Sequence, residues 1–191
     1  MASIRKLLSL GAGAVLFLQA VTASAALDAY ISVKGQKQGQ FKGNSHRDAS
    51  SNVVVKFTHG PTSPADFNRR TAAGEKIHEP LVVTLKLDDS TRPQWVTAQG
   101  GGEVLSSVVL SMFRPASKSS PAAVERITLT NALIEKLDVV NQPGADEVLA
   151  EATDAAVKPI YLRVQLTFQK ITTTNVIGST STTDDWQAHG S

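Results

Sequence analysis

The chain has 191 residues, no cysteine, and 19 basic against 17 acidic residues, which gives a formal net charge of +2 at pH 7. The lack of cysteine excludes a disulfide-stapled scaffold and a cysteine-ligated zinc site. The small net charge does not favour nucleic acid or a membrane surface as a partner, and we expect neither.

The first 25 residues have the order of features typical of a secretory signal peptide. Arg5 and Lys6 precede an uncharged apolar run over residues 7–18, and residues 23–25 (Ala-Ser-Ala) form a small-residue cleavage site. The run is too short for a membrane span, which needs about 20 residues. A buried N-terminal helix is the alternative. We expect Sec-type export, cleavage after Ala25 and a periplasmic or secreted protein.

The rest of the chain suits one domain over residues 26–177 and a flexible tail over residues 178–191, which is rich in Ser, Thr and Gly. Loss of Arg5 and Lys6 leaves equal numbers of acidic and basic residues in this mature part. The basic balance of the full chain therefore comes from the leader alone.

Alternation of apolar and polar residues predicts several β-strands along the domain. A short helix is expected over residues 92–98, with capping residues at 89–91, Pro93 in its first turn, Gly100 at its end and packing through Trp95 and Val96. Strands at regular spacing around one short helix predict a mainly β fold, a small closed or nearly closed antiparallel β-barrel. The expected strands are 29–34, 52–59, 80–87, 104–113, 125–129, 134–139 and 162–171.

Three connections interrupt this pattern. Residues 36–51 form a long polar loop with almost no apolar content, and residues 60–64 carry turn chemistry. Residues 141–158 are acidic and could hold a short helix. A mobile, solvated surface loop is the plain alternative to a functional role for residues 36–51.

No catalytic, cofactor-binding or metal site can be read from the sequence. The four histidines are scattered without metal-ligand spacing, no phosphate loop follows a strand, and Gly-x-Ser-x-Gly is absent. We therefore expect a protein that is not an enzyme, and a hydrolase is the least favoured class.

Several segments, in order and at their spacing, resemble the Hcp family, the tube-forming proteins of bacterial type VI secretion. The strand Asp28-Ala29-Tyr30-Ile31 leading to Gly35 is one of them, and the resemblance extends over about residues 28–175. The other segments are Gly74 to Leu81, Ser90 to Glu103, which fits loosely, Leu110 to Pro115, Leu129 to Ile134 and Leu166 to Ile171.

The resemblance implies a barrel that forms rings, most simply homohexamers, which stack into tubes and carry effector proteins. It also implies that residues 36–51 correspond to an extension reaching a neighbouring copy. The charged and polar side chains in this loop are then interface candidates: Lys37, Lys42, His46, Arg47 and Asp48. The alternative is a monomeric or small-oligomer binding module on the same barrel, in the periplasm or outside the cell.

Overall fold

The computed structural model describes residues 28–62, 65–66, 71–72, 77–114, 123–140 and 160–185. The expected signal peptide and the acidic segment 141–158 lie outside these residues. The elements are β1 (Asp28–Gly35), β2 (Gly39–Gln40), β3 (Ser51–Thr58), β4 (Pro61–Thr62), β5 (Ala65–Asp66), β6 (Thr71–Ala72), β7 (Ile77–His78), β8 (Leu81–Leu87), α1 (Arg92–Gly100), β9 (Leu105–Phe113), β10 (Ala123–Val140), β11 (Ile160–Asn175) and β12 (Thr180–Asp185).

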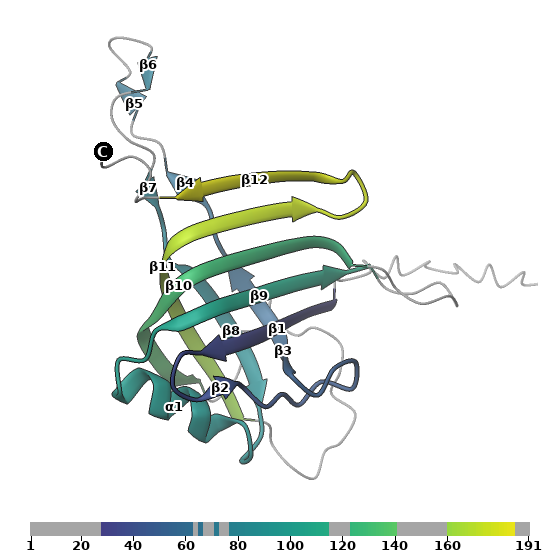
Figure 1. Ribbon diagram of the computed structural model, residues 1–191, viewed down its shortest axis with the longest axis vertical. Helices are drawn as coiled ribbons and strands as arrows, with labels where there is room; N and C mark the ends of the chain where they lie inside the picture. The colour runs from purple at the N-terminus through teal and green to yellow at the C-terminus, as the bar shows by residue number, and fades with distance from the viewer. Residues whose placement is uncertain are drawn as a thin grey trace, which may run out of the picture.

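The main sheet closes on itself as an antiparallel barrel (Figure 1). Its strands follow the order β9, β1, β3, β8, β11 and β10, and β10 returns to pair with β9. Closure depends on the two longest strands, because β10 pairs with β9 through residues 123–132 and with β11 through residues 125–140. Closing a sheet removes most of its exposed edges. The predicted fold class, a small β-barrel with one short helix, is confirmed.

Alternate residues of each barrel strand point into a closed apolar interior, as the period of two predicts. Leu166, expected to face inward on β11, is fully buried. Burying each such side chain stabilises the fold by about 1.5–3 kcal/mol. The largest buried aliphatic side chains of the interior are Ile31, Leu81, Leu85, Leu105, Leu110, Leu129, Leu162 and Leu166.

Helix α1 lies at one end of the barrel (Figure 1), with Pro93 near its start. Trp95 and Ala98 are buried, but Val96 is 45% exposed, so the expectation that Val96 packs inward was wrong. Neighbouring residues on a helix point about 100° apart. Because only one face of α1 packs inward and Trp95 lies on that face, Val96 points into solvent. No helix in the described ranges is long and apolar enough to cross a membrane.

Strand β10 is one element of 18 residues, where the sequence predicted two separate strands, 125–129 and 134–139. Asn131 adopts a positive φ of 50°, and the register with β11 shifts between Ile134 and Lys136. Asparagine tolerates this left-handed conformation better than most residues. These two irregularities therefore bend β10 around the barrel, as β-bulges do, and β10 continues as one strand without a turn.

The start of the expected flexible tail also differs. Residues 180–185 form β12, which pairs with β11 from Lys170↔Asp185 to Asn175↔Thr180 without a register shift. The polar composition that suggested a frayed tail includes β-branched threonines, which suit a pleated strand. A turn at residues 176–179 joins the two strands, and Ser179 has a φ of 51° there.

Candidate assembly surfaces

The loop of residues 36–51, which carries all five predicted interface residues, is folded onto the barrel. Its β2 segment pairs with β1, and the Phe41 N–H donates to the Val33 carbonyl at 2.9 Å. The Phe41 ring is fully buried and meets Trp95 edge to face, with ring centroids 5.6 Å apart. The expectation of a loop without core residues was therefore wrong, because one aromatic side chain is enough to dock it.

The carboxylate of Glu103, a residue that follows α1 in the chain, fixes the start of this loop. Glu103 Oε1 accepts hydrogen bonds from the N–H groups of Lys37 and Gln38, each at 2.7 Å, and Oε2 accepts one from Gln38 Nε2 at 2.7 Å. Burial of Glu103 raises its pKa, but these hydrogen bonds and the charge of Lys37 outweigh burial, so the pKa lies below its ordinary value. The ionised form is the one that holds the turn.

Gly35 leaves the space that this carboxylate occupies. A Cβ atom added at Gly35 would overlap Glu103 Oε1 and lie 3.2 Å from Phe41. The position of the Glu103 carboxylate therefore requires a glycine at residue 35, although 68 positions separate the two residues in the chain. The sequence carried no local signal of this contact.

Asn44 and Asp48 shape the second half of the loop. Asn44 Nδ2 donates to the Lys86 carbonyl at 2.7 Å, and Asn44 Oδ1 accepts from the Val53 N–H at 3.2 Å. Asp48 accepts from the Ser50 N–H at 2.9 Å and from Ser50 Oγ at 2.7 Å. The Ser50 N–H, followed by its hydroxyl, holds the pKa of Asp48 below its ordinary value. Asp48 is thus used in a local turn.

Arg47 also has partners within the chain. Its guanidinium lies 4.5 Å from the centre of the Phe113 ring and 5.5 Å from that of Tyr30. A nitrogen of the same group is 4.0 Å from Asp28 Oδ2. Stacking of this kind suits arginine and attaches the loop to β1 and β9.

The five predicted residues therefore divide into two groups. All five residues are exposed, but the side chains of Arg47 and Asp48 also stabilise the loop itself. The structure joins none of the five to another through a hydrogen bond or ion pair within the described part of the chain. Their role at an interface stays a prediction.

The second long connection is the arm (residues 59–80), for which the sequence predicted only turn chemistry at residues 60–64. Its β4 pairs with β7 through Pro61↔His78 and Thr62↔Ile77, and its β5 pairs with β6. Figure 1 shows β5 and β6 standing beyond the end of the barrel, past β4 and β7. Turn-forming residues at both ends of the segment were the available signal, but they do not reveal the strand pairs between them.

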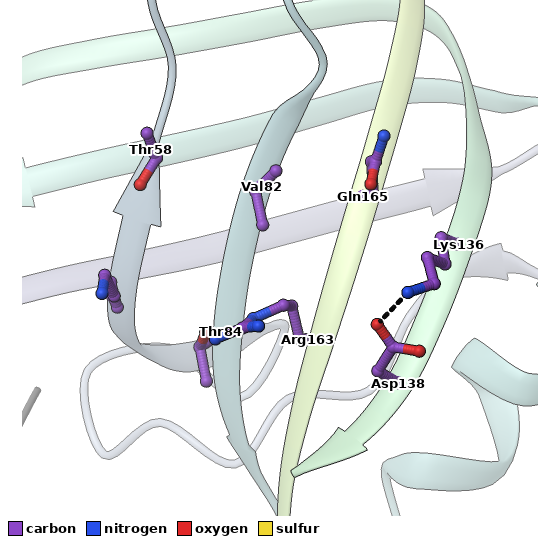
Figure 2. Close-up of a pocket in the computed structure, with 8 residues that line it drawn as sticks. Thr58, Val82, Thr84, Lys136, Asp138, Arg163 and Gln165 are labelled. Atoms are coloured by element: carbon purple, nitrogen blue, oxygen red, sulfur yellow. Dashed lines mark ion pairs between the residues drawn. The ribbon is translucent and has the colours of Figure 1, made fainter. Parts of the chain in front are cut away.

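The outer face of the barrel is hollowed where β3, β8, β11 and β10 lie side by side (Figure 2). The hollow has a volume of about 410 Å³, and Thr84 on its floor is only 2% exposed. Lys136 Nζ and Asp138 Oδ2 form an ion pair of 2.8 Å at its edge. Two rows of cross-strand neighbours line it: Asp138, Arg163, Thr84 and Lys56, then Lys136, Gln165, Val82 and Thr58.

Comparisons with known proteins agree with this geometry. The family described as "Type VI secretion system effector, Hcp" matches residues 30–174. The "Major exported protein" of Pseudomonas aeruginosa is 26% identical over 174 residues, which cover 85% of this chain and 97% of that protein.

Solved structures share the fold. A crystal structure of an Hcp protein superposes with a TM-score of 0.69 at 23% identity, over 84% of this chain and 98% of that one. The secreted protein Hcp3 from Pseudomonas aeruginosa gives a TM-score of 0.64 at 23% identity, over 84% and 99% of the two chains.

Proposed function

Because the chain belongs to the Hcp family of type VI secretion proteins, we propose that it is a structural assembly protein whose copies close into homohexameric rings, which stack and carry effector proteins. The family is a structural secretion family and is not known for enzymes. The barrel interior is filled by side chains, so a cargo has to be held on the outer surface or between copies.

The observation that carries this proposal is the arm. In the described residues, β5 and β6 pair with each other and extend past the end of the barrel, a placement suited to contact with a neighbouring copy. A contact between the arm of one copy and a different surface of the next is heterologous, and such contacts close into rings when the rotation allows it. The arm therefore replaces the loop of residues 36–51 as the leading candidate for joining copies.

The exposed side of the loop is the second candidate. Lys37, Lys42 and His46 face outward from an anchored backbone, so ordering them at an interface costs little main-chain entropy. We assign them a supporting role between rings, where a charge change alters the strength of stacking and leaves each ring intact.

The hollow on the outer face is the proposed contact for cargo. Its floor is a hydroxyl, and its rim carries cations, a carboxylate and an amide. A polar, mixed surface favours reversible contact over the permanent burial typical of obligate interfaces.

Export is proposed to follow the general route, through the leader of residues 1–25. The relative named "Major exported protein" supports an exported protein but not this route. Since chains exported this way fold after transport, any ring would form in the periplasm or outside the cell. N-terminal sequencing of protein made with its own leader should begin at Ala26, and a retained Met1 in soluble protein contradicts the cleavage.

The experiment for the main proposal is the native mass of residues 26–191. We expect a hexamer over a range of concentrations and six-fold rings in electron micrographs. A protein that remains a monomer at high concentration overturns the ring and leaves an exported binding module on the same barrel, with the hollow as its ligand site.

A further inference from the structure

Strand β12 is the outermost strand of the main sheet, and its far edge has no strand partner within the described residues. Figure 1 shows it at the margin of the sheet, beyond β11. An unpaired edge presents main-chain N–H and carbonyl groups to any extended chain that meets it. This edge lies outside the closed barrel.

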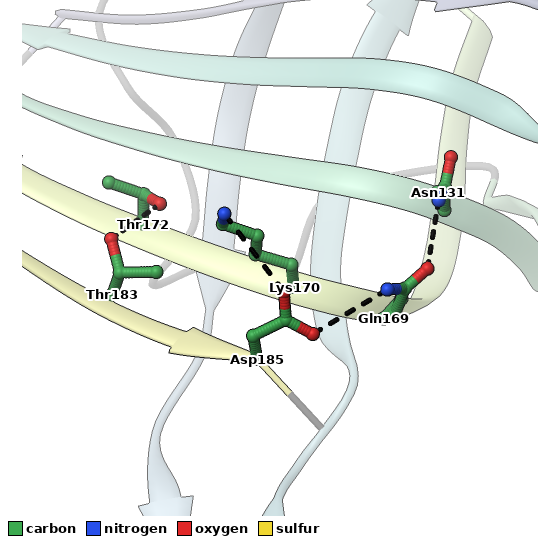
Figure 3. A network of polar contacts seen from close by, with 6 residues as sticks. All are labelled: Asn131, Gln169, Lys170, Thr172, Thr183 and Asp185. Carbon is green, nitrogen blue, oxygen red and sulfur yellow. Dashed lines mark hydrogen bonds and ion pairs between the residues drawn. The ribbon is translucent and has the colours of Figure 1, made fainter. Parts of the chain in front are cut away.

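The edge is held in an ordered, extended form (Figure 3). Thr183 and Thr172 bring their hydroxyl oxygens to 3.0 Å, and Lys170 lies 4.0 Å from Asp185. Gln169 Nε2 donates to Asp185 Oδ1 at 3.5 Å, and Asn131 Nδ2 donates to Gln169 Oε1 at 2.8 Å. A strand fixed in advance loses little freedom when another strand pairs with it.

The usual protections of an edge are missing from most of β12. Its register with β11 has no bulge, and its sequence Thr-Ser-Thr-Thr-Asp-Asp contains no proline or lysine. The first four residues are exposed and neutral, and the threonines favour extended structure. Charge is confined to Asp184 and Asp185, at one end.

The neutral first four residues allow a second copy of this strand to pair with it, and the charged end sets the direction. We propose that β12 pairs with β12 of a second copy, antiparallel and symmetric about Thr182, so that two sheets join across a two-fold axis. Ser181 then lies opposite Thr183 of the second copy, and Thr180 lies opposite its Asp184. No carboxylate faces another, whereas parallel pairing in register would place like charges side by side.

The pairing also obeys the hydrogen-bond pattern of antiparallel strands. In an antiparallel pair, two residues directly opposite each other either both hydrogen-bond to the other strand or both do not. Two identical strands therefore pair only in registers that place the hydrogen-bonding residues of one strand opposite those of the other. Symmetry about Thr182 is such a register. The contact is isologous, and it goes beyond the ring proposed above because it links copies through a surface that ring closure does not require.

A single cysteine tests the register, since the natural chain has none. In Thr182→Cys the two new thiols lie directly opposite, with Cα atoms about 4.5–5.5 Å apart, which is within disulfide reach. Thr180→Cys is the matched control on the same strand, because the two copies of that position are offset by four residues, about 13 Å. Both positions are exposed, so both variants should fold normally.

After mild oxidation of residues 26–191, we expect Thr182→Cys to double in mass on a denaturing, non-reducing gel and Thr180→Cys to stay at the mass of one chain. No dimer with Thr182→Cys, or equal dimer with both variants, overturns the proposal; the second result is what parallel or unspecific contact would give. The denaturing gel reports only this link. Native mass reports both contacts, because the link joins two hexamers where rings form and gives a dimer where they do not, so each proposal can fail without the other.

Discussion

Two long polar connections of this barrel differ in placement: one lies against the barrel and the other extends away from it. The loop of residues 36–51 joins β1 to β3 and lies against the barrel, held by Phe41 and Glu103. The arm joins β3 to β8, and its β5 and β6 stand clear of the barrel. Both connections are polar, so composition does not distinguish them. The difference is that the buried ring of Phe41 and the carboxylate of Glu103, which is distant in the chain, hold the loop in place. The loop is therefore part of the domain, and the arm is the segment that we propose to contact other copies.

The largest effect expected from this comparison is that of Phe41→Ala. A fully buried phenylalanine cut to alanine leaves a cavity and costs about 3–5 kcal/mol of unfolding free energy. Urea denaturation of residues 26–191 measures it. If the loss stays near zero, the loop is not part of the core. For the same reason, deleting residues 39–47 should destabilise the barrel and cannot serve as a clean test of assembly.

Glu103→Gln should have the next largest effect. The substitution removes the charge and sets an amide NH2 against donors that need an acceptor, at a cost of about 2–3 kcal/mol. Denaturation at pH 7 measures the loss. The neighbouring exposed Gln36→Ala is the control and should change little.

The same residue predicts a pH dependence. The pKa of Glu103 is lower in the folded protein than its ordinary value, since hydrogen bonds from Gln38 and Lys37 outweigh burial. Its contribution is therefore complete above the unfolded pKa, about 4.3, and is lost as the pH falls through the folded pKa. Stability measured from pH 7 downward should fall less steeply in Glu103→Gln than in the natural chain. Equal slopes would contradict the role of the carboxylate.

A smaller loss is expected from Asp48→Ala, which removes the acceptor for two hydrogen bonds from Ser50. The turn is exposed, so the cost is about 1 kcal/mol. Asp48→Asn keeps one acceptor oxygen and should retain most of the stability. A thermal unfolding series of the two variants distinguishes the turn from a purely electrostatic role.

The smallest effects on folding belong to Lys42→Glu and His46→Glu. Both side chains are exposed, and each change should alter stability by less than about 0.5 kcal/mol. We expect each variant to keep the mass of one ring while its rings stack less tightly. A variant that dissociates into monomers would move the ring contact from the arm to this loop.

The sequence was sufficient for the barrel and insufficient for its connections. Period-two alternation located β1, β8, β9 and β11 because each buries one face, and burial leaves a local pattern. Trp95 and Pro93 located α1 for similar reasons. The single strand β10 was missed because Asn131 suggests a turn, whereas here its positive φ only bends the strand.

The candidate site depends on contacts that no local pattern records. Glu103 fits against Gly35 only after β1, α1 and β9 have been placed, and Phe41 is one apolar residue in a polar loop. The arm has strand pairs of two residues each, shorter than any periodic signal. The interface role of residues 36–51 came from the family resemblance and from their polar side chains, and it stays a prediction. The anchoring of this loop and the extension of the arm were not visible in the sequence.

The most direct test of this account replaces residues 63–76 with Asn-Gly, a two-residue turn that joins β4 to β7 in their existing register and removes β5 and β6. Sedimentation of residues 26–191 with and without this change compares their masses. We predict hexameric rings for the intact arm and, for the shortened one, a folded protein with unchanged circular dichroism that is no larger than a dimer linked through β12. A shortened protein that still sediments as a hexamer, or an intact protein that never exceeds a dimer, would contradict the claim that the arm joins the subunits.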